Sequence, residues 1–141
     1  MNAARSNPSS ETRKQRVLIV EDDTMLAWNL EYLVQNAGYD VVGPAATLTD
    51  ALRLAQSSDL DAALLDIRLA QDELVFPAAE ILRQRGIPFI FTTAYSRDVP
   101  RSNGFKEPTL LKPLERTVLE KMIKYLTQGP APFPTRRGAL S

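Results

Sequence analysis

The chain has 141 residues, 44% of them apolar, and its 17 basic side chains equal its 17 acidic side chains in number. This length and apolar content predict one folded domain with a substantial core, and the balanced charge gives no reason to expect binding to nucleic acid or to an anionic membrane. The absence of cysteine excludes disulfides and thiolate chemistry, and the absence of histidine excludes a Ser-His-Asp triad or a histidine phosphocarrier.

The two ends of the chain differ in composition from its centre. Residues 1–14 are polar and residues 129–141 are rich in proline, so we expect a disordered arm and a disordered tail around one domain over residues 15–128. No apolar run approaches the ~20 residues of a membrane span, and residues 1–16 lack the apolar core of a signal peptide. We therefore expect a cytoplasmic, single-domain protein that contacts no membrane.

Five short apolar runs predict the strands of a parallel sheet. A short apolar run between polar residues is typical of a strand that is buried on both faces. We expect Pro44 to stop the second run, because a proline cannot donate to a strand ladder. The runs span residues 17–20, 39–43, 62–65, 89–91 and 109–111.

Helices are expected between these strands. Apolar residues recur at helical spacing over residues 24–37 and 114–127, a capping-box-like pattern starts a helix near residue 47, and a proline suits the first turn of a helix over residues 77–85. Residues 96–108 have little apolar periodicity and contain proline, glycine and asparagine. We expect a loop or one to two helical turns there, more mobile than the rest of the chain.

Some side chains outside the expected core have a role that the sequence leaves open. Met25, Trp28 and Tyr32 form a second apolar stripe on the first helix; we expect them to cover a sheet edge or a neighbouring helix, with an exposed partner surface as the alternative. The last helix also has more apolar positions than one sheet face needs; we expect core packing to account for part of them, with a homodimer or a partner interface as alternatives for the rest. Asp59 and Asp61 precede the central strand, and we expect them to be solvated surface charges.

Polar side chains follow four of the strand-like runs where each run ends. Glu21 and Asp22 follow the first run, and Asp66, Thr93 and Lys112 end or follow three others. In an open α/β sheet the reactive groups lie just beyond the carboxyl ends of the strands, so these side chains are expected to converge. Clustered carboxylates favour a cation with oxygen ligands such as Mg²⁺, and a hydroxyl and an ammonium can hold phosphoryl oxygens while an aspartate is the nucleophile. The pattern predicts a phosphoryl-accepting site.

The order and spacing of these residues resemble a known family. Glu21-Asp22, Asp66, Thr93-Ala94 and Lys112-Pro113, each after an apolar strand, resemble the receiver domain of bacterial response regulators over residues 17–127. Residues 88–95 are similar to the Phe-Ala-Thr-Gly-hydrophobic-Tyr signature of a receiver subgroup common among alphaproteobacterial regulators. The resemblance implies an α/β, flavodoxin-like fold, with a doubly wound five-stranded parallel sheet in the order 2-1-3-4-5 and a short or disordered fourth helix.

The resemblance also implies a role for each site residue. Asp66 would accept the phosphoryl group, Thr93 would bond it and Lys112 would pair with it, while the Lys112–Pro113 peptide is often cis in this family. The Mg²⁺ ligands would come from Asp22, Asp66 and the backbone carbonyl of Arg68, with Glu21 acting mostly through water. The implied partners are a histidine kinase or histidine phosphotransfer protein as donor and an unidentified protein as target or next relay member; a sink that drains a kinase fits equally well.

Two departures from the family pattern keep an alternative open. The family usually has a glycine or proline shortly after the acceptor, where this chain has Gln71 and Asp72, and the usual aromatic switch position is Thr109, so the switch is expected to be absent or rerouted through Tyr95. The alternative is a receiver fold that serves as a phosphorylation-independent binding or dimerisation module. A haloacid-dehalogenase-type phosphohydrolase is disfavoured, because that family needs an aspartate where Arg68 stands.

Overall fold

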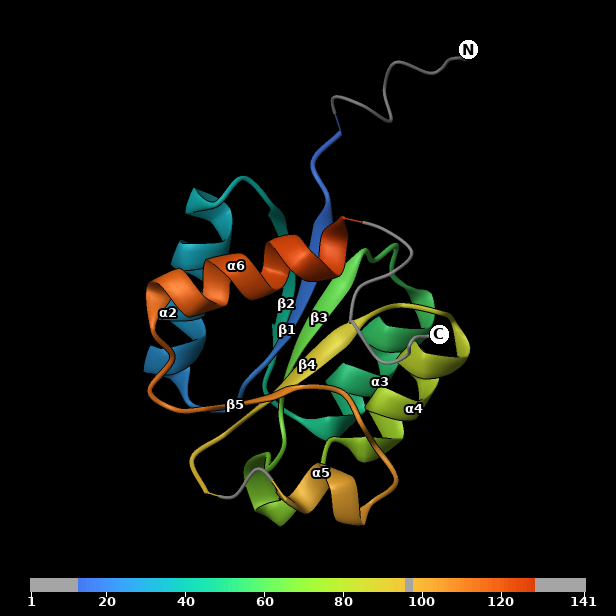
Figure 1. Ribbon diagram of the computed structural model, residues 1–141. Coiled ribbons are helices and arrows are strands. Elements are labelled where there is room, and N and C mark those ends of the chain that lie inside the picture. The colour runs from blue at the N-terminus through green and yellow to red at the C-terminus, as the bar shows by residue number, and fades with distance from the viewer. Residues whose placement is uncertain (1–12, 96–97, 129–141) are drawn as a thin grey trace.

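The computed structural model describes residues 13–95 and 98–128, which form a parallel sheet with helices on both faces (Figure 1). The sheet order is β2-β1-β3-β4-β5, and every pairing is parallel, which confirms the predicted flavodoxin-like order. The predicted tail over residues 129–141 and most of the predicted arm over residues 1–14 lie outside the described residues. The strands are β1 (Arg16–Val20), β2 (Asp40–Ala45), β3 (Ala62–Asp66), β4 (Phe89–Thr93) and β5 (Thr109–Leu111).

Helices occupy the crossovers between the strands. Asp23 caps α2 by accepting a hydrogen bond from the Leu26 N–H, and Thr47 caps α3 by accepting one from the Asp50 N–H, as the capping pattern predicts. The 3-10 turn η1 (Ala70–Asp72) lies in the loop after β3. The helices are α2 (Thr24–Asn36), α3 (Leu48–Ser57), α4 (Phe76–Gln84), α5 (Asp98–Ser102) and α6 (Arg116–Thr127). Within the described ranges, no helix is long and apolar enough to cross a bilayer.

Two apolar clusters hold the layers together, one on each face of the sheet. Successive side chains of a strand point to opposite faces, so Val17 and Ile19 pack with α2 and α6, whereas Leu18 and Val20 pack on the side of α3 and α4 (Figure 1). Every residue of β3 is buried, as expected for a strand covered on both faces. Packing of these apolar residues fixes the position of each strand in the sheet. It thereby also fixes the position of the polar residues that follow each strand.

The short helix α5 is anchored by aromatic packing. Phe105, which follows it, is buried and stacks on Phe76 with ring centroids 5.2 Å apart, and it meets Phe91 edge-on at 5.5 Å. Such pairs stabilise beyond the apolar area that they bury. The helix has five residues, which agrees with the predicted one to two turns; the predicted higher mobility stays a prediction.

The prediction that Pro44 stops the second strand is wrong. Strand β2 continues through Pro44 to Ala45, and the Gly43–Pro44 peptide is cis. Proline is tolerated because β2 lies at the edge of the sheet, where no further strand needs its missing N–H. Gly43 has φ 93°, and a Cβ there would lie 2.8 Å from the Ala45 nitrogen and 2.9 Å from the Ile19 oxygen, so only glycine fits.

The second apolar stripe of α2 does not cover another element. Met25, Trp28 and Tyr32 are all largely exposed, Trp28 by 68%. The expectation that they pack on a sheet edge or a neighbouring helix is therefore wrong. The reason is that Ala27, Leu30 and Val34 already provide the face that α2 buries against the sheet.

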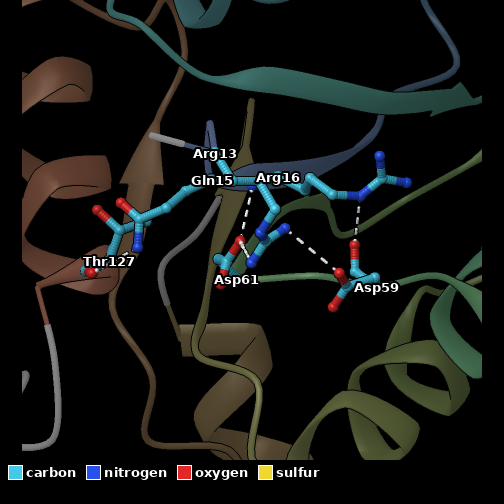
Figure 2. Close-up of polar contacts among 6 residues, drawn as sticks. All are labelled: Arg13, Gln15, Arg16, Asp59, Asp61 and Thr127. Atoms are coloured by element: carbon cyan, nitrogen blue, oxygen red, sulfur yellow. Dashed lines mark hydrogen bonds and ion pairs between the residues drawn. The ribbon is translucent and has the colours of Figure 1, made fainter. Parts of the chain in front are cut away.

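Polar contacts close the end of the sheet opposite the carboxyl ends of the strands (Figure 2). Asp61, expected to be a solvated charge, is half-buried and accepts a 2.8 Å hydrogen bond from the Arg16 N–H. Arg13 lies 3.3 Å from the Asp59 carboxylate and 3.7 Å from that of Asp61, and the Gln15 amide donates to the Thr127 carbonyl at the end of α6. The start of β1 is thus joined to the start of β3 and the end of α6.

Candidate functional site

The structure brings the predicted site residues together at the carboxyl ends of the strands. Asp66 ends β3 and pairs in register with Thr92, and Thr93 ends β4 in register with Leu111. Lys112 follows directly, and its backbone N–H donates a 2.7 Å hydrogen bond to the Thr93 carbonyl. The parallel register therefore places Asp66, Thr93 and Lys112 side by side at the carboxyl-terminal edge of the sheet.

Lys112 bridges two buried carboxylates. Its Nζ lies 2.7 Å from Glu21 Oε1 and 3.2 Å from Asp66 Oδ2. The other oxygen of Glu21 accepts a hydrogen bond from the Asp23 N–H at 3.1 Å. Charge-assisted hydrogen bonds of this kind are strong where water is excluded, so the three side chains hold one another in place.

Burial and like charge make Asp66 a weak acid. Burial raises the pKa of the Asp66 carboxyl from its ordinary 3.8 to about 7, with the nearby charge of Glu21 adding to the rise and Lys112 opposing it. Burial alone would lower the pKa of Lys112, but the hydrogen bond to Glu21 and the charge of Asp66 outweigh it and raise that pKa above its usual value. The site thus contains more negative charge than Lys112 can neutralise.

The carboxylates that carry this surplus negative charge are ligands that a divalent cation prefers. One carboxylate oxygen each from Glu21, Asp22 and Asp66 lies within 4.8 Å of the others. Asp22 is exposed whereas Glu21 and Asp66 are buried, so the cluster opens to water on one side. Mg²⁺ takes oxygen ligands and keeps several waters, and this donor set with an open side suits it.

These side chains line a cavity of about 530 Å³, which opens at the surface. Asp66 and Thr93 are buried at its floor, whereas Arg68, Asp72 and Tyr95 line it while remaining exposed. The Thr93 hydroxyl oxygen accepts a 3.1 Å hydrogen bond from the Tyr95 N–H, which orients the hydroxyl and leaves its own hydrogen to donate. The cavity is therefore polar at its floor and charged at its opening.

The loop after Asp66 turns without glycine, as the sequence requires. Gln71 and Asp72 both have positive φ, 62° and 58°, so two L-residues occupy the left-handed region. The two ends of the loop are held by the Leu69 N–H, which donates to the Glu73 carbonyl at 2.7 Å, and by the Val75 N–H, which donates to the Ile67 carbonyl at 2.9 Å. The surrounding backbone thus imposes a conformation that a glycine would adopt more readily.

Sequence reasoning missed a group of side chains at the opening of the cavity. Arg68 Nη1 lies 3.6 Å from Asp72 Oδ1, and its guanidinium lies 5.9 Å from the centre of the Tyr95 ring. A contact between the side chains of Arg68 and Asp72 was not expected from the sequence. The four-residue spacing between them was the one signal in the sequence, and it is informative only once the loop folds as a turn.

A family model for the response regulator receiver domain matches residues 17–124. The chain belongs to this family. Receiver domains are signalling domains of two-component systems, so the family assigns the chain to two-component signalling rather than to a class of metabolic enzymes. The cis Lys112–Pro113 peptide agrees with what the resemblance implied.

Two of the similar proteins are regulators named PhyR. It is 38% identical to the phyllosphere-induced regulator PhyR of Methylorubrum extorquens over 81 residues, which are 56% of this chain and only 30% of that protein. The solved receiver domain of PhyR from Erythrobacter litoralis has a TM-score of 0.74 and 31% identity, covering 85% of this chain and 97% of that one.

A third similar protein is a receiver domain whose structure contains a metal ion. The receiver domain of the sensor histidine kinase PA1611 from Pseudomonas aeruginosa PAO1 has a TM-score of 0.72 and 26% identity, covering 82% of this chain and 99% of that one. Its structure has a magnesium ion coordinated in the active-site cleft.

Proposed function

We propose that this receiver accepts a phosphoryl group on Asp66 from a histidine kinase or a histidine phosphotransfer protein. The observation that carries the proposal is the bridge of Lys112 to both Glu21 and Asp66, at the floor of a cavity that Thr93 also lines. An aspartate beside an ammonium and a hydroxyl donor can attack a phosphorus atom while the donors hold the phosphoryl oxygens. The chain has no histidine, so the phosphoryl group must come from another molecule.

We further propose that Mg²⁺ binds at the carboxylate cluster. Glu21, Asp22 and Asp66 would supply its carboxylate oxygens, directly or through water, and the backbone carbonyl of Arg68 would supply a neutral one. The proposal is supported by the mutual approach of the three carboxylates and by the magnesium ion in the PA1611 receiver domain. When bound, Mg²⁺ would neutralise charge on Asp66 and on the phosphoryl oxygens.

The residues of the chain then have distinct tasks. Asp66 forms the new bond to phosphorus, and the bond between phosphorus and the donor's nitrogen or oxygen breaks. Lys112 keeps its contact with the carboxylates until the phosphoryl oxygens arrive, when it can pair with them instead. Thr93 donates its hydroxyl hydrogen to a phosphoryl oxygen, since its oxygen is already held by the Tyr95 N–H. The signal would leave the domain as protein–protein interaction or as onward transfer.

Intact-mass spectrometry after incubation with acetyl phosphate and Mg²⁺ tests this function. We expect one phosphoryl adduct on the wild type, none on Asp66→Asn and none when a chelator removes the metal. The control is Asp59→Asn, which removes an exposed carboxylate at the opposite end of the sheet and is expected to be modified like the wild type. An unmodified wild type under all metal conditions would contradict the proposal and favour a phosphorylation-independent binding module.

A further inference from the structure

Three large apolar side chains lie exposed on one face of α2. Met25, Trp28 and Tyr32 are 70%, 68% and 63% exposed, and we call them the α2 stripe. Their spacing of three and four residues places them on one face of the helix, away from the face that packs on the sheet. Single exposed apolar residues are ordinary, whereas a contiguous group of large ones marks a surface that binds another segment or molecule.

The α2 stripe borders a groove at the edge of the sheet. The groove has a volume of about 390 Å³ and lies between α2 and the end of β2, with Trp28 and Pro44 among its lining residues. Among the described residues that line the groove, none is basic, and the acidic ones are Glu21, Asp22 and Glu31. This surface therefore suits an apolar segment that is accompanied by cationic side chains.

The sequence that follows α6 has this chemistry. Residues 129–141, which lie outside the described residues, contain three prolines, Phe133, Arg136 and Arg137, and they contain no acidic residue. Every residue over 130–134 is a proline or precedes one, and both positions favour an extended backbone. Extended proline-rich segments bind surfaces lined with aromatic rings, because they lose little conformational entropy on binding.

The end of α6 lies close to the end of α2. Both helices pack on the same face of the sheet and end at the edge opposite the site (Figure 1). The hydroxyl of Tyr39, just after α2, lies 3.2 Å from the hydroxyl of Thr127, the last residue of α6. The 13 residues of α2 make a helix about 20 Å long. An extended segment over residues 129–136 spans about 25 Å, so it can run back along α2.

We propose that residues 130–137 of this chain bind back onto the α2 stripe. The prolines and Phe133 lie against the two aromatic rings of the stripe, and the two arginines lie beside Glu31, the one charged residue of α2. The contact is intramolecular, so it forms at a high effective concentration that does not depend on the concentration of the protein. It involves a surface that phosphoryl acceptance does not use and requires no phosphorylation of Asp66.

Fluorescence of Trp28 tests this contact directly, because the chain contains one tryptophan. In the full chain we expect the bound segment to protect Trp28 from acrylamide, a neutral collisional quencher. We compare it with the variant Pro132→Ser/Phe133→Ser/Pro134→Ser, which removes the apolar side chains of the segment. This variant should lose the protection, and its emission should shift to longer wavelength, as expected for a side chain that the domain alone leaves 68% exposed.

A matched control makes the same kind of change beyond the proposed contact. Ala139→Ser/Leu140→Ser also replaces apolar residues after α6 by serine, and it should keep the quenching and the emission of the wild type. Far-UV circular dichroism verifies that each variant is folded.

Reversal of charge tests the position of the arginines. Glu31→Arg alone should weaken the protection of Trp28, because it places like charges together, and so should Arg136→Glu/Arg137→Glu alone. Combining all three substitutions restores opposite charges, so the protection should return. The control is Glu80→Arg in α4, which packs on the other face of the sheet and should leave the protection unchanged.

Three results would overturn the proposal. The first is equal quenching of Trp28 in the wild type and in the serine variant of residues 132–134. The second is a protection that increases with protein concentration, which would show that a second copy of the chain covers the α2 stripe. The third is a combined charge variant that does not regain protection. If the serine variant fails to fold, the charge variants decide.

Discussion

At the scale of single residues, Asp66 links the acidity of the site to the stability of the fold. Its pKa is raised to about 7 in the folded protein, through burial and the charge of Glu21, from an ordinary 3.8. Between these pH values the folded state holds a proton that the unfolded state has lost. The free energy of unfolding should therefore fall as the pH rises from about 4 to 7 and then level off.

Asp66→Asn removes this titration and should stabilise the metal-free protein. We expect the variant to gain about 1–3 kcal/mol at pH 8 and to lose that advantage progressively as the pH falls from about 7 to 4. Urea unfolding in the presence of a chelator, repeated across this pH range, measures it. A variant that is no more stable than the wild type at pH 8 would show that Lys112 fully offsets the cost of burying the charges of Glu21 and Asp66.

Lys112→Ala should have the opposite effect. It removes the ammonium that bridges Glu21 and Asp66, and a buried charge that has lost its partner typically costs about 3–5 kcal/mol. We expect added Mg²⁺ to restore part of the loss, since the proposed cation would neutralise the same carboxylates. Urea unfolding with and without Mg²⁺ measures both the loss of stability and its recovery. The control is Lys121→Ala, which removes an exposed lysine. A loss of stability equal to that of the control would contradict the account.

At the scale of elements, the turn after β3 has a backbone conformation that its residue types disfavour. Gln71 has φ 62°, which glycine adopts without penalty. We expect Gln71→Gly to stabilise the protein by about 1 kcal/mol. The control is Lys121→Gly, an exposed position in the middle of α6, where glycine should destabilise by about 0.5–1 kcal/mol. Thermal unfolding measures both, and a destabilising Gln71→Gly would mean that the turn is not strained.

The two apolar stripes of α6 should differ in their contribution to stability. Leu119, Ile123 and Leu126 are buried against the sheet, whereas Val118 on the other stripe is 44% exposed. Leu119→Ala should cost about 2–5 kcal/mol, while Val118→Ala should stay within about 0.5 kcal/mol. Comparable losses at the two positions would show that Val118 is covered in solution, as in a homodimer. Urea unfolding at several protein concentrations distinguishes these cases.

At the scale of the whole molecule, the parallel sheet and the meeting of the site residues were predictable from the apolar runs, whereas the order of the strands came from the family resemblance. The apolar runs are continuous because β1, β3 and β4 are covered on both faces, and their ends are marked by polar residues. Parallel strands carry such residues to one edge of the sheet, so the sequence alone predicts that Asp66, Thr93 and Lys112 lie close together. The roles assigned to them came from the family resemblance.

What the sequence could not predict depends on the position of each residue in the finished fold. Pro44 is tolerated only because β2 is an edge strand, and Trp28 is exposed only because other residues of α2 already cover the sheet. Asp61 is half-buried because the chain before β1 returns to it. The contact between Arg68 and Asp72 depends on two left-handed residues, which no local propensity favours.

The most direct test of the central claim is to locate the phosphoryl group. Sodium borohydride reduces an acyl phosphate to an alcohol, so treatment of the phosphorylated protein converts the modified aspartate to homoserine and releases phosphate. Peptide mass spectrometry then reads the position. We predict homoserine at position 66 alone, only when both the phosphodonor and Mg²⁺ were present. Homoserine at another aspartate, or an adduct that leaves position 66 unreduced, would contradict the account.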